Sequence, residues 1–260
     1  MSFLNNNIDL NNIAFKYKQK YKMAEPFPHI VINDMFNPKI LDDIINEFPD
    51  LSKKVAAKFD NPLEKKFAGL GNKLFGVQTN HFMNYLNSEV FINFLQNLTG
   101  IKEKLIADPR FIGGGLHEIK RGGYLKIHAD FNKHTLTKLD RRINVLIYFN
   151  KNWLNSYRGN LEFWNKDMKK CIQSIKPTFN KIVIFNTTNF TYHGTPNTVL
   201  CPENYSRKSL AVYYYSDGRP KDEVNFKLKK HSTIFKQRYK NDDDKDCGEE
   251  SYYHLCSHYD

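Results

Sequence analysis

The sequence predicts an α+β fold, with helices gathered in the first hundred residues and short strands in the rest. Two runs before residue 101 repeat their apolar residues at helical spacing. From Leu105 onward, short runs rich in Val, Ile, Tyr and Phe alternate with Gly, Asn and Pro turns, which is typical of a β-sandwich or barrel. Strand and helix patterns do not alternate, so a doubly wound sheet is disfavoured.

The first fifty residues contain one strand and one helix by pattern. Residues 1–24 are rich in Asn and Lys and weakly patterned, so we expect a weakly structured leader that could include a short helix. The segment after Pro26 alternates apolar and polar residues and predicts a strand. A helix is predicted to begin at Pro38, capped by Asn37, and to end before Pro49.

The following segment is less clear. Residues 50–75 are charged and lack a period, so they form either a mobile loop near a site or a long surface connection, and the second is the commoner use of such segments. A second helix is predicted from Ser88, with Gly100 as its stop. After Pro220, a basic stretch that could add a final strand or helix leads into an acidic tail, which has little to bury and is predicted to be disordered.

The length allows a single domain with a full core. We divide the chain into a leader over 1–24, one domain over 25–220 with its motif core at 105–216, and a C-terminal extension over 221–260. The net charge of +11 is uneven, because residues 241–260 carry −6 and the remainder +17. A basic body either attracts nucleic acid and other anions or reflects lysines on solvated faces, and no nucleic-acid module signature is present.

The cysteine spacing and the hydropathy of the sequence indicate the cellular compartment that we expect for the protein. The four cysteines, which lack a disulfide-framework spacing, are Cys171, Cys201, Cys247 and Cys256. Reduced thiols are therefore expected. The last two, with His254 and His258, make a poor zinc candidate because no C-x₂-C pair is present. The sequence shows no secretory signal and no apolar run of the ~18 residues that span a bilayer, so we expect a cytoplasmic protein without membrane association.

Two histidines and one carboxylate form the candidate metal site. His128 and Asp130 are two residues apart in an alternating run, which places both side chains on one face of a strand. His193 follows a separate β-like run at 182–185. Two histidines and a carboxylate are the ligand set of non-heme Fe(II) oxygenases. An H-x-D pair alone arises easily by chance, so the surrounding motifs decide between a ligand pair and a surface histidine beside a solvated aspartate.

These motifs follow one another through the strand-rich region. In order they are HAD at 128–130, YFNKNW at 148–153, GNLEFW at 159–164, KPTFNKIVIF at 176–185, HG at 193–194 and RKSLAVYY at 207–214. In order, spacing and extent, residues 105–216 resemble the catalytic domain of the 2-oxoglutarate/Fe(II) dioxygenases, specifically the prolyl 4-hydroxylase-like branch. The resemblance implies a double-stranded β-helix, or jelly roll, supported by the N-terminal helices.

The resemblance also implies roles for single residues. His128, Asp130 and His193 correspond to the catalytic iron ligands, and Arg207 to the residue that binds the distal carboxylate of 2-oxoglutarate. A guanidinium suits that role because it binds a carboxylate through two parallel hydrogen bonds. Lys208 competes in charge, but successive strand residues point to opposite faces, so we expect Lys208 to face away.

Further residues have weaker assignments. Ser209 shares the face of Arg207 and is expected to add a hydroxyl contact to the co-substrate. Tyr148 matches a position whose phenol reaches the co-substrate carboxylate, although a core aromatic fits equally. The sequence departs from the family with Asn160 in a Gly-Gly turn and with Leu125 where a tyrosine is frequent. His117 and His134 flank the H-x-D pair, and we expect them to lie at the surface or to support the site rather than to bind the metal. Arg142 and Asn144 either line the pocket or have structural roles.

The implied activity is hydroxylation of an unactivated C–H bond, most naturally in a protein or peptide residue, with succinate and CO₂ as co-products. The cofactors would be Fe(II), 2-oxoglutarate and O₂, with ascorbate as an optional reductant. Two alternatives are the same chemistry on a free amino acid, sugar or other metabolite, and a non-catalytic jelly-roll binding module, which the complete ligand set opposes. A nucleic-acid dealkylase is disfavoured because Tyr213 stands where that group has a second arginine.

Overall fold

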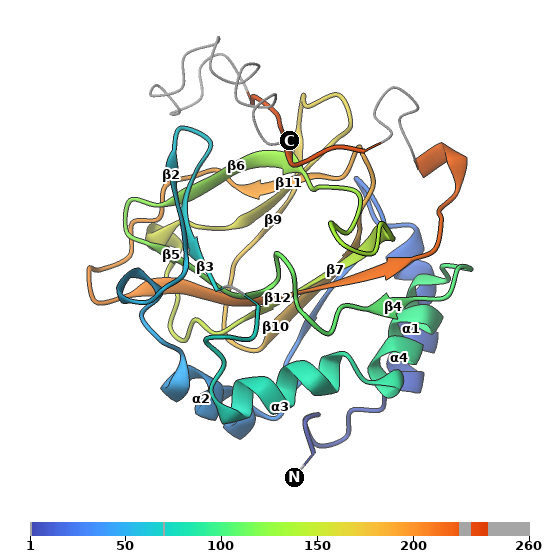
Figure 1. Cartoon of the computed structure of the whole chain (residues 1–260), viewed down its shortest axis with the longest axis horizontal. Coiled ribbons are helices and arrows are strands. Elements are labelled where there is room, and N and C mark those ends of the chain that lie inside the picture. The colour runs from blue at the N-terminus through green and yellow to red at the C-terminus, as the bar shows by residue number, and fades with distance from the viewer. Residues whose placement is uncertain (1, 70, 224–229, 239–260) are drawn as a thin grey trace.

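The computed structural model describes residues 2–69, 71–223 and 230–238 (Figure 1). The helices are α1 (Leu10–Lys22), α2 (Pro38–Glu47), α3 (Val77–Leu86) and α4 (Glu89–Thr99). The first strands are β1 (His29–Asn33), β2 (Ala57–Asn61), β3 (Glu64–Ala68), β4 (Ile106–Ala107), β5 (Gly115–Lys120), β6 (Tyr124–Ala129) and β7 (Asp140–Tyr148). The later strands are β8 (Leu161–Trp164), β9 (Cys171–Ile175), β10 (Lys181–Asn186), β11 (Tyr192–Thr195), β12 (Ser206–Ser216) and β13 (Ile234–Phe235).

The strands form one curled antiparallel sheet, whose hydrogen-bonded order is β1-β10-β7-β12-β5-β3-β6-β11-β8-β9. Because the sheet folds over on itself, the layer containing β10, β7 and β12 lies opposite the layer containing β6, β11 and β8 (Figure 1). The helices lie beside and below the first layer, on its outer side. This confirms the predicted α+β class with a jelly-roll core and supporting N-terminal helices.

Successive side chains along the strands of the first layer point alternately into the helix-covered core and into the interior of the roll. Residues that pack into the main core with the helices include Ile143, Val145, Ile147, Ile182, Ile184, Leu210, Val212 and Tyr214. The residues that alternate with them face the other way, where polar groups such as Asn144, Arg207 and Ser209 line a cavity. The two-residue period of a strand therefore buries aliphatic side chains under the helices and directs polar side chains into the roll.

The two predicted helices form as expected. Asn37 caps α2 by accepting a hydrogen bond from the backbone N–H of Lys39, and Pro38 occupies the first turn. Ser88 caps α4 in the same way, and Gly100 ends it with a left-handed backbone at φ 69°.

Helix α3 has no such local signal. Its N-cap is Gly76, which provides no side-chain acceptor. The carboxylate of Glu47, at the end of α2, instead accepts hydrogen bonds from the backbone N–H groups of Gln78 and Thr79. A cap supplied from 31 residues away in the sequence is not visible to a local pattern.

We expect Glu47→Ala to lower the free energy of unfolding by about 1–2 kcal/mol, because a helix N-terminus loses its cap and a nearby negative charge. Urea unfolding followed by circular dichroism measures the change. Asn46→Ala is the matched control, since Asn46 is exposed on the same helix. Equal losses in the two variants would contradict the capping role of Glu47.

The N-terminal segment is more ordered than the sequence predicted. Residues 10–22 form a regular helix whose buried side chains Leu10, Ile13, Ala14 and Tyr21 lie in the main core. Only four residues of the thirteen are buried, so the apolar pattern is weak and the helix depends on packing against α4. Among the described residues, no helix combines the length and apolar character needed to cross a membrane.

The segment 50–75 also differs from the prediction. It is not simply a surface connection, because residues 57–68 form the hairpin β2–β3, and β3 pairs with both β5 and β6. Its charged residues obscure the alternation. Near the C-terminus, β13 pairs with β6, so a short final strand does form.

The described residues include two of the four cysteines and exclude the acidic tail. Cys171 and Cys201 are free thiols. The acidic tail and the weak zinc candidate of Cys247, His254, Cys256 and His258 lie outside the described residues.

Candidate active site

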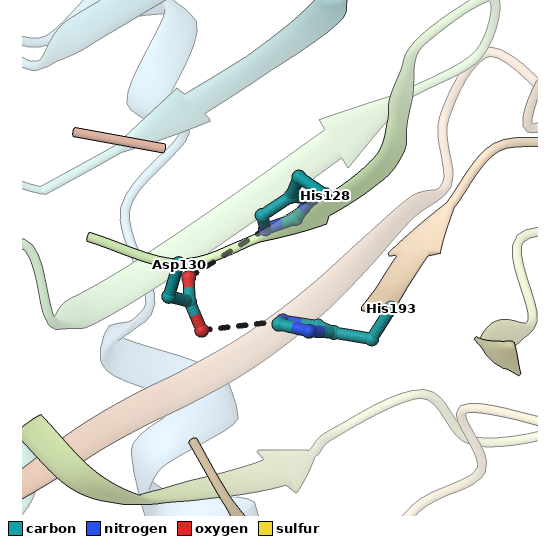
Figure 2. Close-up of side chains that lie close together, drawn as sticks. All are labelled: His128, Asp130 and His193. Carbon is teal, nitrogen blue, oxygen red and sulfur yellow. Dashed lines mark ion pairs between the residues drawn. The ribbon is translucent and has the colours of Figure 1, made fainter. Parts of the chain in front are cut away.

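His128, Asp130 and His193 converge inside the roll (Figure 2). His128 is on β6 and faces His193 on the neighbouring strand β11, where the two residues are direct register partners. The Asp130 carboxylate lies beside both rings, 3.6 Å from His128 Nε2 and 3.4 Å from His193 Nε2. One donor atom of each residue lies within 4.8 Å of the other two, which is the spacing of a metal site.

Backbone hydrogen bonds orient both imidazoles. The Nδ1 atom of His128 lies 2.8 Å from the carbonyl oxygen of Lys126, and that of His193 lies 3.0 Å from the carbonyl oxygen of Thr191. A carbonyl can only accept, so Nδ1 of each ring carries the proton and donates it. The Nε2 lone pairs are therefore left to face Asp130, which is the usual arrangement of metal-binding histidines.

A buried polar network fixes the Asp130 carboxylate. Its Oδ2 atom accepts a hydrogen bond of 2.8 Å from Asn144 Nδ2 and lies 3.3 Å from Arg141 Nη2. Arg141 also donates from Nε and Nη2 to Asn144 Oδ1, at 2.9 and 2.7 Å. The guanidinium lies over the rings of Phe131 and Tyr213, 4.3 and 3.5 Å from their centroids. The network engages Oδ2 and leaves Oδ1 for a metal.

Burial and charge set the protonation states of this cluster. Burial alone would raise the pKa of Asp130, but the Arg141 guanidinium and the two histidines outweigh it and hold that pKa well below its usual range. Burial lowers the pKa of His193 to about 4 despite the opposing effect of Asp130. At neutral pH the cluster thus offers an anionic oxygen and an uncharged imidazole nitrogen, which fits a divalent iron.

A small inner cavity of about 90 Å³ connects the cluster to Arg207. Arg207 is buried, and its Nε donates to the carbonyl oxygen of Gly159 at 2.7 Å while its Nη2 donates to the Tyr148 hydroxyl at 3.1 Å. The Nη1 group has no hydrogen-bond partner among the described residues. An oriented, buried guanidinium with donors to spare fits a carboxylate ligand.

Two glycines make this geometry possible. Gly159 has φ +73°, and a Cβ there would lie 3.3 Å from Arg207 Cδ. A Cβ at Gly194 would lie 2.7 Å from the carbonyl oxygens of Leu125 and Lys126, so only glycine lets β11 approach β6 this closely next to His193.

The other predicted co-substrate residues lie near Arg207. Ser209 lines the inner cavity beside it. Tyr148 is fully buried and does not line that cavity, so it contacts Arg207 from behind. Lys208 lies on the opposite face, with Nζ 5.0 Å from the ring centroid of Phe48, in agreement with the prediction that it faces away.

The sequence left the roles of four polar residues open, and the structure places two of them in the site and two outside it. Asn144 and His117 belong to the site, since both line the inner cavity and His117 Nε2 is buried without a partner among the described residues. His134 pairs with Asp108, 3.4 Å away. Arg142 pairs with Glu103 at 2.9 Å on the other side of β7, so its role is structural.

Sequence reasoning missed Arg141 and the β2–β3 hairpin. The hairpin forms one wall of an outer cavity of about 480 Å³ that shares His128, Asp130 and Arg141 with the inner one. Lys66 on β3 lines both cavities. A charged hairpin that pairs with β6, the strand that carries His128, has no local sequence signal.

Comparisons with known proteins bear on the family. Residues 114–215 match the family model described as the 2OG-Fe(II) oxygenase superfamily. No curated protein matches the chain at a significant level. The matched segment contains all three clustered residues and Arg207.

Solved structures with a similar fold include two prolyl hydroxylases and HygX. A prolyl hydroxylase from Trichoplax adhaerens, in complex with a hypoxia inducible factor peptide fragment, has TM-score 0.61 and 14% identity, and the match covers 80% of this chain and 90% of that one. A prolyl-4-hydroxylase from Pseudomonas putida has TM-score 0.57 and 12% identity, covering 81% and 100%. HygX from Streptomyces hygroscopicus, with nickel, 2-oxoglutarate and hygromycin B bound, has TM-score 0.51 and 10% identity, covering 80% and 92%.

The sequence match and the shared fold agree with each other and with the donor set. They confirm the predicted enzyme class and its cofactors Fe(II), 2-oxoglutarate and O₂. Residues 114–215 therefore match the 2OG-Fe(II) oxygenase superfamily, and the fold of the chain is similar to that of prolyl 4-hydroxylases.

Proposed function

We propose that this protein hydroxylates a residue of a peptide or protein, with His128, Asp130 and His193 as its iron ligands and Arg207 as the anchor for 2-oxoglutarate. The observation that supports this proposal best is the convergence of two Nε2 atoms and one carboxylate on a cavity lined by a buried arginine. When bound, iron and 2-oxoglutarate supply the oxidising chemistry that places one oxygen atom of O₂ in a C–H bond and leaves succinate and CO₂.

The protein's own contribution is binding and orientation. His128 and His193 would donate Nε2, and Asp130 would donate Oδ1 because Oδ2 is engaged by Asn144. Arg207 would receive the distal carboxylate of the co-substrate, with Ser209 beside it and Tyr148 holding the guanidinium in place. The low-dielectric surroundings strengthen these contacts and exclude bulk water from the reacting groups.

The substrate assignment rests on the outer cavity. It opens directly onto His128 and Asp130 and is much larger than the inner one, so a side chain of an extended chain can reach the metal while its backbone stays outside. The similar enzyme from Trichoplax adhaerens holds a peptide fragment. A small metabolite is the second candidate, because HygX has the same fold with hygromycin B bound.

The test combines spectroscopy with product analysis. Anaerobic addition of Fe(II) and 2-oxoglutarate should produce a visible charge-transfer band, and peptides incubated in air should gain 16 mass units together with succinate. A band and succinate without any modified peptide would favour the small-molecule alternative. The absence of both band and succinate would favour a non-catalytic module.

We expect Asn144→Ala to weaken Fe(II) binding about 10- to 100-fold, because Asp130 loses the hydrogen bond that orients its carboxylate. Competition with a fluorescent metal chelator measures the affinity. Asn160→Ala is the control, since Asn160 hydrogen-bonds Ser174 at the surface. An unchanged affinity in Asn144→Ala would show that Arg141 alone suffices to orient Asp130.

A further inference from the structure

A second groove of about 460 Å³ adjoins the outer cavity. It lies between the β2–β3 hairpin on one side and residues 230–235 on the other. Phe59, Glu64, Phe131 and Thr233 line both spaces, so they are continuous. Residues 230–235 lie outside the segment 114–215 that matches the oxygenase family model.

The groove is apolar at its centre. Its lining includes the aromatic rings of Phe59, Phe131 and Phe235 together with Leu63. The rings come from the hairpin, from the segment after β6 and from β13, so three separate parts of the chain contribute. Such a setting suits one large apolar side chain of a ligand.

The rim of the groove and the outer cavity is positively charged. The cationic side chains lining the two spaces are Lys66, Arg110, Lys133, Arg141 and Lys230. Two carboxylates, Glu64 and Asp130, lie among them and are paired with Lys66 and Arg141. Arg110 and Lys230 are exposed and have no ion-pair partner among the described residues. The lining therefore favours a ligand that carries negative charge.

The C-terminal wall is tied to the metal-binding strand. Phe235 is the register partner of His128, and the two rings are 5.5 Å apart between centroids. The backbone N–H of Lys236 donates to the carbonyl oxygen of Ile127 at 2.7 Å. At the other end, the His231 N–H donates to Asn132 Oδ1 at 3.0 Å. A ligand in the groove would thus lie at a fixed position relative to the reacting atoms.

We propose that this groove binds the part of the peptide substrate that flanks the hydroxylated residue. It selects a large apolar side chain, aromatic or aliphatic, with an Asp or Glu next to it. The apolar side chain packs among Phe59, Phe131 and Phe235, and the carboxylate meets Lys230 at the rim. This inference rests on the proposed peptide hydroxylation and adds a selection rule to it.

The test uses a peptide library in which the central position and the flanking positions are all randomised. The wild-type enzyme and two variants, Lys230→Glu and Phe59→Ala, are compared by sequencing the peptides that gain 16 mass units. Wild-type products should be enriched in acidic residues beside a large apolar residue. Lys230→Glu should lose the acidic preference and raise the KM of the best peptide about five- to tenfold. Phe59→Ala should lose the apolar preference.

The matched controls are Lys18→Glu and Phe15→Ala, which make related changes at exposed positions on α1. Both should keep the wild-type selection. Identical flank selection in the wild type and both groove variants would overturn the groove assignment while leaving peptide hydroxylation intact. No modified peptide at all would overturn the peptide proposal and the groove with it. A fall in the KM for the peptide after deletion of residues 239–260 would instead mean that the chain's own acidic segment occupies the groove and competes with the peptide.

Discussion

Asp130→Ala is expected to abolish turnover and to remove high-affinity iron binding. Asp130 supplies the carboxylate in the three-residue donor set, and no imidazole can replace its charge. The same change leaves the buried Arg141 guanidinium without its ion-pair partner, so we also expect a loss of about 3–5 kcal/mol in the free energy of unfolding. Succinate formation, metal titration and chemical unfolding measure the three effects.

The conservative change separates chemistry from stability. Asp130→Asn keeps the shape of the side chain and an oxygen acceptor, so the unfolding free energy should fall less than in the alanine variant, while turnover should still be lost. Asp217→Asn is the control because Asp217 is exposed and outside the donor set. His128→Ala and His193→Ala should also lose turnover. Substantial turnover in Asp130→Asn would rule out Asp130 as an essential ligand.

The parts of this site that follow strand alternation could be predicted from the sequence. His128 and Asp130 share a face because they are two residues apart, and Arg207 and Ser209 share a face for the same reason. The adjacent Lys208 correspondingly lies against Phe48, outside the roll. Convergence of the separate strands β6, β11 and β12 could not be derived from spacing alone and entered through the family resemblance.

The sequence did not single out Arg141 as the arginine beside Asp130, and this has a physical reason. Strict alternation from Asn144 puts Arg142 on the cavity face, and lining the pocket was one of the two roles left open for Arg142. The pairing of β7 with β12 shifts register, so that Tyr214 pairs with Ile143 and Tyr215 pairs with Arg141. A bulge of this kind adds one residue and reverses the faces beyond it. Arg141 therefore enters the site, and Arg142 turns toward Glu103.

Arg207→Ala is expected to raise the KM for 2-oxoglutarate about 100-fold, because losing a charged, bidentate contact to a carboxylate costs roughly 2–3 kcal/mol. Initial rates of succinate formation at increasing 2-oxoglutarate measure the effect, and saturating co-substrate should recover part of the rate. Iron binding should stay close to wild type, since Arg207 contacts Gly159 and Tyr148 and is not one of the metal donors.

Substitutions at and near Arg207 separate the effect of its oriented guanidinium from the effect of net charge. Lys208→Ala removes the adjacent positive charge from the outer face and should leave the KM for 2-oxoglutarate unchanged. Arg207→Lys should fall between wild type and alanine, because an ammonium keeps the charge and loses the planar fork. Tyr148→Phe removes one contact that holds the guanidinium, so its KM should rise only a few-fold. Equal effects of Arg207→Ala and Lys208→Ala would mean that net charge alone attracts the co-substrate, and the oriented guanidinium would then have no specific role.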